Sequence, residues 1–192
     1  MASTPVIDAF IGALARRRAT GQAVDAGTCA GACVAQMTAW GAGRALVPDD
    51  AWLARLGLPD TIRAAGIEIV TWPSDRGWRE LLGLDDAPPT CAVTVPIGAV
   101  AERGTLLVGS SPTHGRSLDA VGWWHLAILR ADLISATLAE ALGIAYAGTA
   151  PPSAISLVSG PSRTSDVEKI TTYGAHGALE EHVVVVRSSP SG

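Results

Sequence analysis

Short runs of mostly apolar residues constrain the fold of this chain more than any other feature. Two of them are Ile155–Val158 and Val183–Val186, and each is bounded by polar or turn-forming residues. Such runs are typical of strands that are buried on both faces of a parallel sheet. They alternate with segments of helical apolar spacing, such as residues 5–18. The alternation predicts an α/β fold with three layers, α/β/α, around a mixed, mostly parallel sheet.

The same patterns predict the individual elements. Strands are expected at 44–47, 67–72, 91–95, 105–109, 124–129, 155–158 and 182–186. Helices are expected at 5–18, 28–40, 49–56, 59–65, 74–82, 135–142 and 165–171. The nine residues of 96–104 are too few for a crossover helix, so the strands that flank them are expected to be antiparallel or joined by a tight turn. With no repeat or linker, the 192 residues are expected to form one domain, with a helical segment at 1–40 and a flexible tail at 188–192.

Composition excludes several classes of protein. The chain is 48% hydrophobic and 17% charged, which argues against disorder, and its net charge of −4 argues against a nucleic-acid-binding surface. No apolar stretch is long enough for a transmembrane helix, and the N-terminus lacks the pattern of a signal peptide. The three cysteines include no CxxC pair, and two thiols at Cys29 and Cys33 are too few for a zinc site. A cytoplasmic protein without nucleic-acid or membrane partners is therefore expected, and no metal site is predicted.

The stretch 155–177 contains the strongest local signal for a binding site. An apolar strand ends at Ser159-Gly160-Pro161-Ser162, and Ser165 and Glu168 then have the spacing of a capping box. A strand, a glycine-containing turn and a helix N-terminus together form a common anion site. The side chains expected to contribute are Ser162, Arg163, Thr164 and Ser165. The alternative is an ordinary capped helix, in which Asp166 does no more than complement the helix dipole.

Two segments together resemble the LUD domain, the lactate-utilization family of LutC/YkgG-type proteins. Residues 98–108 are similar to the family's IAETGT motif, with Glu102, Gly104 and Thr105 matching. Residues 159–177 are similar to its SGPS-x-T-x-D-I-E…HGP signature. The resemblance covers roughly residues 40–187. Two positions depart from the family pattern: Arg103 stands in place of a threonine, and Ala178 in place of a proline.

The resemblance implies a fold like that of NagB, RpiA and the CoA transferases, and a role in L-lactate oxidation beside iron–sulfur oxidoreductase subunits. In CoA transferases of this fold, a glutamate forms an acyl–CoA adduct. By this analogy Glu102 is the candidate nucleophile or general base. His176, on a glycine-flanked bend, is a candidate acid/base or hydrogen-bond donor to a substrate oxygen. The alternatives are a solvated glutamate paired with Arg103 and a turn histidine bonded to backbone. The candidate ligand-binding residues are Gly104, Thr105, Ser159, Gly160, Ser162, Arg163, Thr164, Ser165, Asp166 and Gly177.

Two functions remain open from the sequence. One is the binding or conversion of a small organic acid, or of an acyl or phosphorylated ligand. The other is a non-catalytic accessory module that docks on iron–sulfur subunits. Whether the chain is an enzyme, and with which cofactor, is left open. A dinucleotide-binding enzyme is disfavoured, because no GxGxxG follows an expected strand. His125 is expected to be a core histidine, whereas the loop with His114 and Arg116 is expected to border the site.

Overall fold

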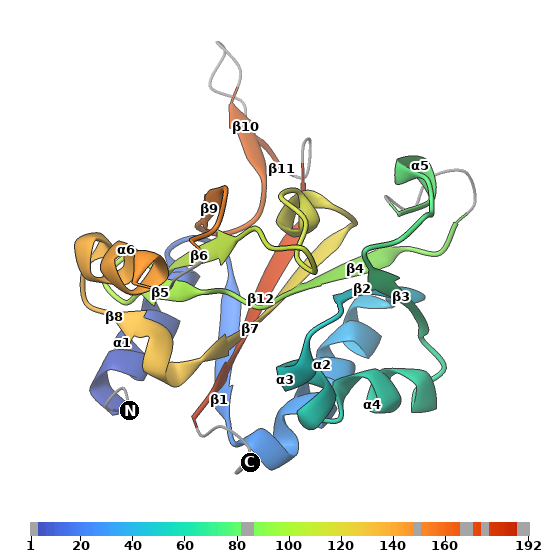
Figure 1. Cartoon of the computed structure of the whole chain (residues 1–192), viewed down its shortest axis with the longest axis horizontal. Coiled ribbons are helices and arrows are strands. Elements are labelled where there is room, and N and C mark those ends of the chain that lie inside the picture. Colours follow the sequence, from blue (N-terminus) through green and yellow to red (C-terminus); the bar gives the residue numbers. More distant parts are fainter. Residues whose placement is uncertain (1–3, 82–86, 148–150, 166–170, 174–176, 188–192) are drawn as a thin grey trace.

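A parallel sheet of six strands forms the centre of the protein (Figure 1). The computed structural model describes residues 4–81, 87–147, 151–165, 171–173 and 177–187. Across the sheet the strands are β1 (Thr20–Val24), β12 (Glu180–Val186), β7 (Trp124–Arg130), β4 (Thr90–Thr94), β2 (Arg44–Pro48) and β3 (Glu68–Trp72). The central strands β2, β4 and β7 are almost completely buried, as their apolar runs predict.

Three helices cover one face of this sheet. They are α2 (Ala26–Trp40), α3 (Ala51–Arg55) and α4 (Leu58–Ala64). Their apolar side chains pack against alternate residues of β2, β4, β7 and β12 in one large core. Cys29, Cys33 and Cys91 all lie in this core as free thiols. Burial raises the pKa of the Cys91 thiol, so this cysteine acts as a small apolar core residue.

The opposite face is covered by a helix and a second sheet. The helix is α1 (Thr4–Ala15). The second sheet has the order β8 (Ile134–Ser135), β5 (Gly98–Val100), β6 (Thr105–Gly109) and β9 (Ile155–Val158), with α6 (Leu138–Tyr146) on its outer side. The predicted fold class, an α/β domain around a mostly parallel sheet, is confirmed. The strands 105–109 and 155–158 nevertheless belong to this second sheet. The antiparallel or tight-turn arrangement expected between the strands 91–95 and 105–109 is wrong, because β4 lies in the first sheet and β6 in the second. An unpredicted strand between them, β5, pairs antiparallel with β6.

The helix expected at 165–171 is wrong at both of its ends. Strand β10 (Arg163–Ser165) pairs antiparallel with β11 (Thr171–Tyr173), so the turn after β9 leads into a hairpin. Threonine and tyrosine favour strands, and the pairing of the two segments outweighs the capping-box spacing. The segment 1–40 is also not purely helical, since it contains β1. The remaining short elements are α5 (Trp78–Leu81), η1 (Leu118–Ala120) and η2 (Ala131–Leu133).

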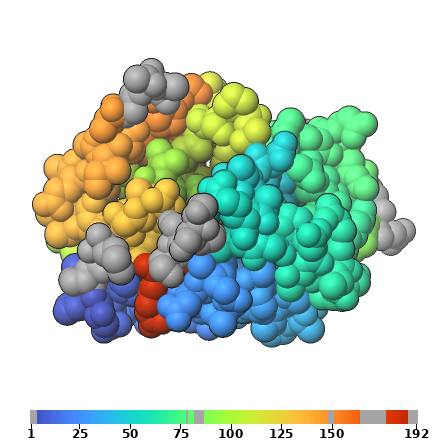
Figure 2. All heavy atoms as spheres, turned by 60° about the horizontal axis from the view of Figure 1, so that its bottom comes forward, coloured from blue at the N-terminus to red at the C-terminus, as the bar shows by residue number. Residues whose placement is uncertain are grey.

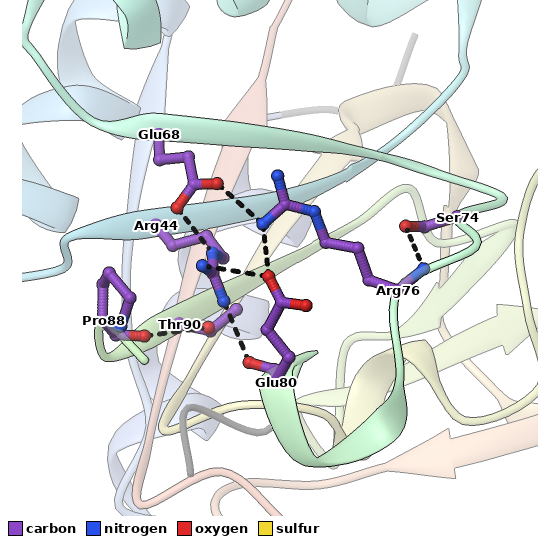
Figure 3. Close-up of polar contacts among 7 residues, drawn as sticks. All are labelled: Arg44, Glu68, Ser74, Arg76, Glu80, Pro88 and Thr90. Atoms are coloured by element: carbon purple, nitrogen blue, oxygen red, sulfur yellow. Dashed lines mark hydrogen bonds and ion pairs between the residues drawn. The ribbon is translucent and has the colours of Figure 1, made fainter. Parts of the chain in front are cut away.

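A network of ion pairs holds α5 to the amino end of the sheet (Figure 3). The buried Arg44 of β2 contacts Glu68 at 2.8 Å and Glu80 at 3.5 Å, and Arg76 pairs with the same two glutamates. Burial alone would raise the pKa of Glu68, but hydrogen bonds from Arg44 and Arg76 outweigh it and lower that pKa. Every charge in this network has a partner, so we interpret it as structural.

In the described part of the chain, no helix combines the length and apolar character needed to cross a membrane.

Candidate functional site

Three hollows in the surface bring together the polar residues of interest. The Glu102 hollow, of about 430 Å³, is lined by Glu102, Arg103, Thr105, Ser159 and Arg17, among others. β6 and β9 pair so that Leu106 lies opposite Val158, which places Thr105 beside Ser159. Their hydroxyl oxygens are 2.7 Å apart and form a hydrogen bond. The acidic turn at 102 and the bend at 159 are therefore neighbours.

Glu102 itself lies in an open setting. Its carboxylate accepts a hydrogen bond from Arg103 Nε at 3.3 Å, and both side chains are more than half exposed. Its carbonyl oxygen accepts another from Arg16. The ion pair expected from the sequence is thus present. This solvated pair matches the alternative interpretation of Glu102 better than a nucleophile desolvated in a cleft does.

The glycines of the two motifs have a packing role. Gly104 (φ 60°) and Gly160 (φ 88°) both have left-handed backbone angles. A Cβ atom at Gly104 would lie 2.9 Å from the backbone of Leu14, and one at Gly160 would collide with the carbonyl oxygen of Arg17. Both glycines therefore let the chain approach the carboxyl end of α1. Their presence needs no ligand to explain it.

The second hollow, which we term the bend pocket, has a volume of about 230 Å³. The bend Ser159–Ser162 and Gly177 line it, so the structure brings these two parts of the second motif together there. Behind them lie His125 and Glu181, neighbours on β7 and β12 whose side chains approach to 3.3 Å. His125 Nε2 lies 2.8 Å from the hydroxyl oxygen of Thr94. His125 is therefore a buried and hydrogen-bonded histidine, as expected.

The other predicted site residues are placed as follows. Arg163 is exposed on β10. Thr164 and Ser165 follow it on the same strand, so they do not begin a helix. Asp166 and His176 lie outside the described residues, and the roles predicted for them stay predictions.

The third hollow, the carboxyl-end cavity, lies at the carboxyl ends of β2, β4 and β7 and measures about 520 Å³. Because the chain runs outward from β2 to β3 and then returns to β4 on the other side of β2, the strand order reverses between β2 and β4. Open α/β sheets bind ligands at such a reversal. Figure 2 shows a hollow here, between the cyan-to-teal segment around α3 and the gold-to-orange segment of η2 and α6.

Two ring nitrogens of residues that line the carboxyl-end cavity lack hydrogen-bond partners. They are Nε1 of Trp52 and Nε2 of His114, and neither has a partner within the described ranges. Both residues line the cavity with only 8% and 6% of their surfaces exposed. Burial of a polar group without a partner costs on the order of 1–3 kcal/mol, so such atoms need an explanation. A ligand that supplies an oxygen acceptor would provide one.

His114 is held in its neutral form. Burial, with a smaller contribution from the nearby His125, lowers the pKa of this imidazole from 6.5 to about 4, and Asp50 opposes the shift. A neutral imidazole carries one donor and one acceptor nitrogen. The loop that holds the ring is closed by two backbone hydrogen bonds between Ser111 and His114. The sequence predicted that this loop borders a site, but the burial of the ring was not visible in it.

Cationic groups stand at the edge of the cavity. Arg130 lines it and is held by two contacts to Asp132, at 3.1 and 2.6 Å. Arg55, on α3, is exposed and has no ion-pair partner among the residues that the structure describes. Asp50, the acidic residue in the lining, accepts backbone hydrogen bonds from Trp52 and Leu53 as the cap of α3. The free positive charge of Arg55 therefore favours an anionic ligand.

Comparison with known proteins identifies the family. The family model of the LUD domain matches residues 90–186. This chain belongs to the LUD domain family. The resemblance seen in the sequence, to LutC/YkgG-type members, is thereby confirmed. The match includes the two motifs, the bend pocket, and His114 and Arg130 of the carboxyl-end cavity. Trp52 and Arg55 precede it.

Curated LUD relatives extend the likeness toward the N-terminus. Lactate utilization protein C of Geobacillus kaustophilus is 27% identical over 169 residues, which cover 82% of this chain and 68% of that protein. The uncharacterized protein YkgG of Escherichia coli is 30% identical over 145 residues, covering 73% of this chain and 62% of that protein. A crystal structure of a DUF162 family protein from Deinococcus radiodurans superposes with a TM-score of 0.68, 20% identity, and coverage of 97% and 99% of the two chains. This likeness shows that the two chains share a fold.

Proposed function

We propose that this protein acts in lactate utilization as a LutC-like member of the LUD family, and that it binds a small organic acid, or an acyl or phosphorylated derivative, in the carboxyl-end cavity. The part in lactate utilization is supported by relatives named lactate utilization protein C. The binding is supported by one observation above all. The buried ring nitrogens of His114 and Trp52 lack partners in the described chain, and both residues line a cavity at the reversal of strand order.

The chemistry of the cavity fits such a ligand. The indole N–H of Trp52 is a donor only, and the neutral ring of His114 donates from one nitrogen. Both therefore suit carboxylate, carbonyl or phosphate oxygens, and Arg55 adds a planar cation at the rim. The volume of about 520 Å³ falls within the 300–1,000 Å³ that is typical of ligand pockets. The cavity thus has room for an acyl or phosphorylated ligand larger than lactate.

A thermal-shift screen tests this proposal. Candidate ligands are lactate, sugar phosphates, acyl-CoAs and nucleotides, each titrated so that the midpoint shift yields a dissociation constant. Arg55→Gln is expected to weaken binding of the best acid at least about tenfold, because a hydrogen bond to a charged group is lost. Arg63→Gln is the matched control, since it removes an arginine charge from exposed α4. If no acid shifts the midpoint, or if both variants behave alike, the proposed site is wrong.

A second candidate function is the accessory module, which one surface feature favours. Trp123 and Leu179 are each 42% exposed and adjacent, and Leu179 donates its backbone N–H to the carbonyl of Trp123. Large apolar side chains that stay exposed side by side are common at protein interfaces. The resemblance implies iron–sulfur oxidoreductase subunits as the partner. A pull-down with purified subunits, repeated with Trp123→Ser, distinguishes this role: capture that survives the substitution would argue against this surface.

A further inference from the structure

The bend pocket has a different chemistry from the carboxyl-end cavity. Among the described residues, four buried side-chain nitrogen or oxygen atoms lack a hydrogen-bond partner. Two are the ring nitrogens of the carboxyl-end cavity. The other two are carboxylate oxygens, Oε1 of Glu181 and Oδ1 of Asp119, and both residues line the bend pocket. Unpartnered oxygen acceptors call for a ligand that donates hydrogen bonds.

Glu181 carries most of this inference. Only 2% of the residue is exposed, and its Oε2 is engaged by His125 Nδ1 at 3.3 Å. The second oxygen, Oε1, is left without a partner beside the pocket. Removing a carboxylate from water is costly unless a cation or several donors replace the lost hydration. The single contact with His125 replaces only part of it.

Among the described residues, the rest of the lining supplies no compensating charge. Asp119, at η1, adds a second carboxylate, and Ser162 adds a hydroxyl. No lysine or arginine lines the pocket in the part of the chain that the structure describes. The anion site predicted for this bend is therefore not supported by the charges around it, which are acidic. A divalent metal ion is also disfavoured, because the described residues contain no cluster of three His, Cys, Asp or Glu ligands.

We propose that the bend pocket binds a small primary ammonium compound, held by the carboxylates of Glu181 and Asp119. An ammonium group has three N–H donors and one positive charge, so it satisfies both unpartnered oxygens and neutralises the pocket at once. The volume of about 230 Å³ is below that of pockets for drug-sized ligands, so a compound of a few heavy atoms fits. This site lies outside the proposed anion cavity and does not depend on it.

Titration with ethanolamine and methylammonium, followed by thermal shift and calorimetry, tests the proposal. Both compounds should bind the unmodified protein, whereas tetramethylammonium, which has the charge but no N–H donor, should bind at least about tenfold more weakly. Glu181→Gln should weaken ethanolamine binding by a similar factor. Because loss of the contact with His125 also affects folding, Asp119→Asn serves as a second variant at a partly exposed position.

Asp60→Asn is the matched control, because it removes one carboxylate from α4 on the opposite face of the sheet. The proposal is overturned if ethanolamine does not bind, if tetramethylammonium binds equally well, or if Asp119→Asn and Asp60→Asn have the same effect. A crystal structure soaked with ethanolamine that shows only water at Glu181 would overturn it as well.

Discussion

Protonation of His114 is expected to make the stability of this protein depend on pH in a defined window. The pKa of the ring is about 4 in the folded protein, against 6.5 for an exposed histidine. As the pH falls through 6.5, His114 becomes protonated in the unfolded chain but stays neutral in the folded protein, so unfolding becomes more favourable. The contribution of the neutral His114 ring to the unfolding free energy is fully present above pH 6.5. It decreases progressively between pH 6.5 and about pH 4, and it changes no further below that pH.

The size of this effect follows from the shift. A difference of ~2.5 pH units at 1.36 kcal/mol per unit corresponds to about 3 kcal/mol. The figure needs no large discount for solvent screening, because only 6% of His114 is exposed. It is a large share of the 5–15 kcal/mol that separates a typical domain from its unfolded state.

Urea unfolding of the wild type and of His114→Gln, from pH 7.5 to 4.5, measures this effect. Glutamine keeps a hydrogen-bonding side chain but does not titrate. Glu68, His182 and all other titrating groups are present in both proteins, so their contributions cancel when the two unfolding free energies are subtracted. We expect this difference to be constant above pH 6.5 and to change by about 1.4 kcal/mol per unit below it. A difference that does not vary with pH would refute the buried, neutral state of His114.

Three further predictions concern packing and charge. Gly160→Ala should lower the unfolding free energy by more than about 2 kcal/mol, because the added Cβ collides with the carbonyl of Arg17 at a left-handed backbone angle. The control Gly12→Ala, in an open position on α1, should raise the unfolding free energy by ~0.5–1 kcal/mol. Equal effects of the two substitutions in urea unfolding would contradict the packing role of the bend. Arg44→Met should cost about 2 kcal/mol, since it strips the buried cation from two half-exposed glutamates, and a midpoint unchanged within error would show that the network contributes little. Glu102→Gln should change the unfolding free energy by less than ~0.5 kcal/mol, because it removes only an exposed ion pair. If Glu102 is the nucleophile, mass spectrometry should detect an acyl adduct in the wild type and none in the variant. The absence of any adduct in the wild type would refute that role.

The sequence was most informative where burial alone determines the structure. The run 105–109, which is apolar except for Thr105, becomes a buried strand with the predicted bounds, because a short, mostly apolar run has few other ways to be buried. The run 155–158, which includes Ser156, also becomes a strand with the predicted bounds but is only partly buried. The strand Thr20–Val24 was missed, because it has no such run and is held by pairing with β12. The hairpin at 163–173 was missed for a related reason. Its strands are stabilised by each other, whereas the capping-box spacing is a purely local signal.

The candidate sites were only partly visible in the sequence. The motif residues Glu102, Thr105 and Ser159 do lie together, because β6 and β9 pair in the register that the structure shows. The carboxyl-end cavity carries no motif, although a usable signal was present: Asp50 and Arg130 each lie at or just beyond the end of a predicted strand. Strand order was the missing information, since it decides which of these ends meet.

The distribution of the four unpartnered buried atoms argues that both hollows bind ligands. Packing faults would leave nitrogens and oxygens without partners at unrelated places. In the described residues, the two residues that carry the nitrogens line one cavity, and the two that carry the carboxylate oxygens line the other. The charges of the two hollows differ in the same way: Arg55 lies at the rim of the hollow with the unpartnered nitrogens, and two acidic residues line the hollow with the unpartnered oxygens. The pKa of His114 shows that His125, behind the second hollow, is close enough to influence the first electrostatically. A ligand that brings positive charge beside His125 should therefore lower the pKa of His114 further, and an NMR titration of its ring with and without ethanolamine would detect that coupling.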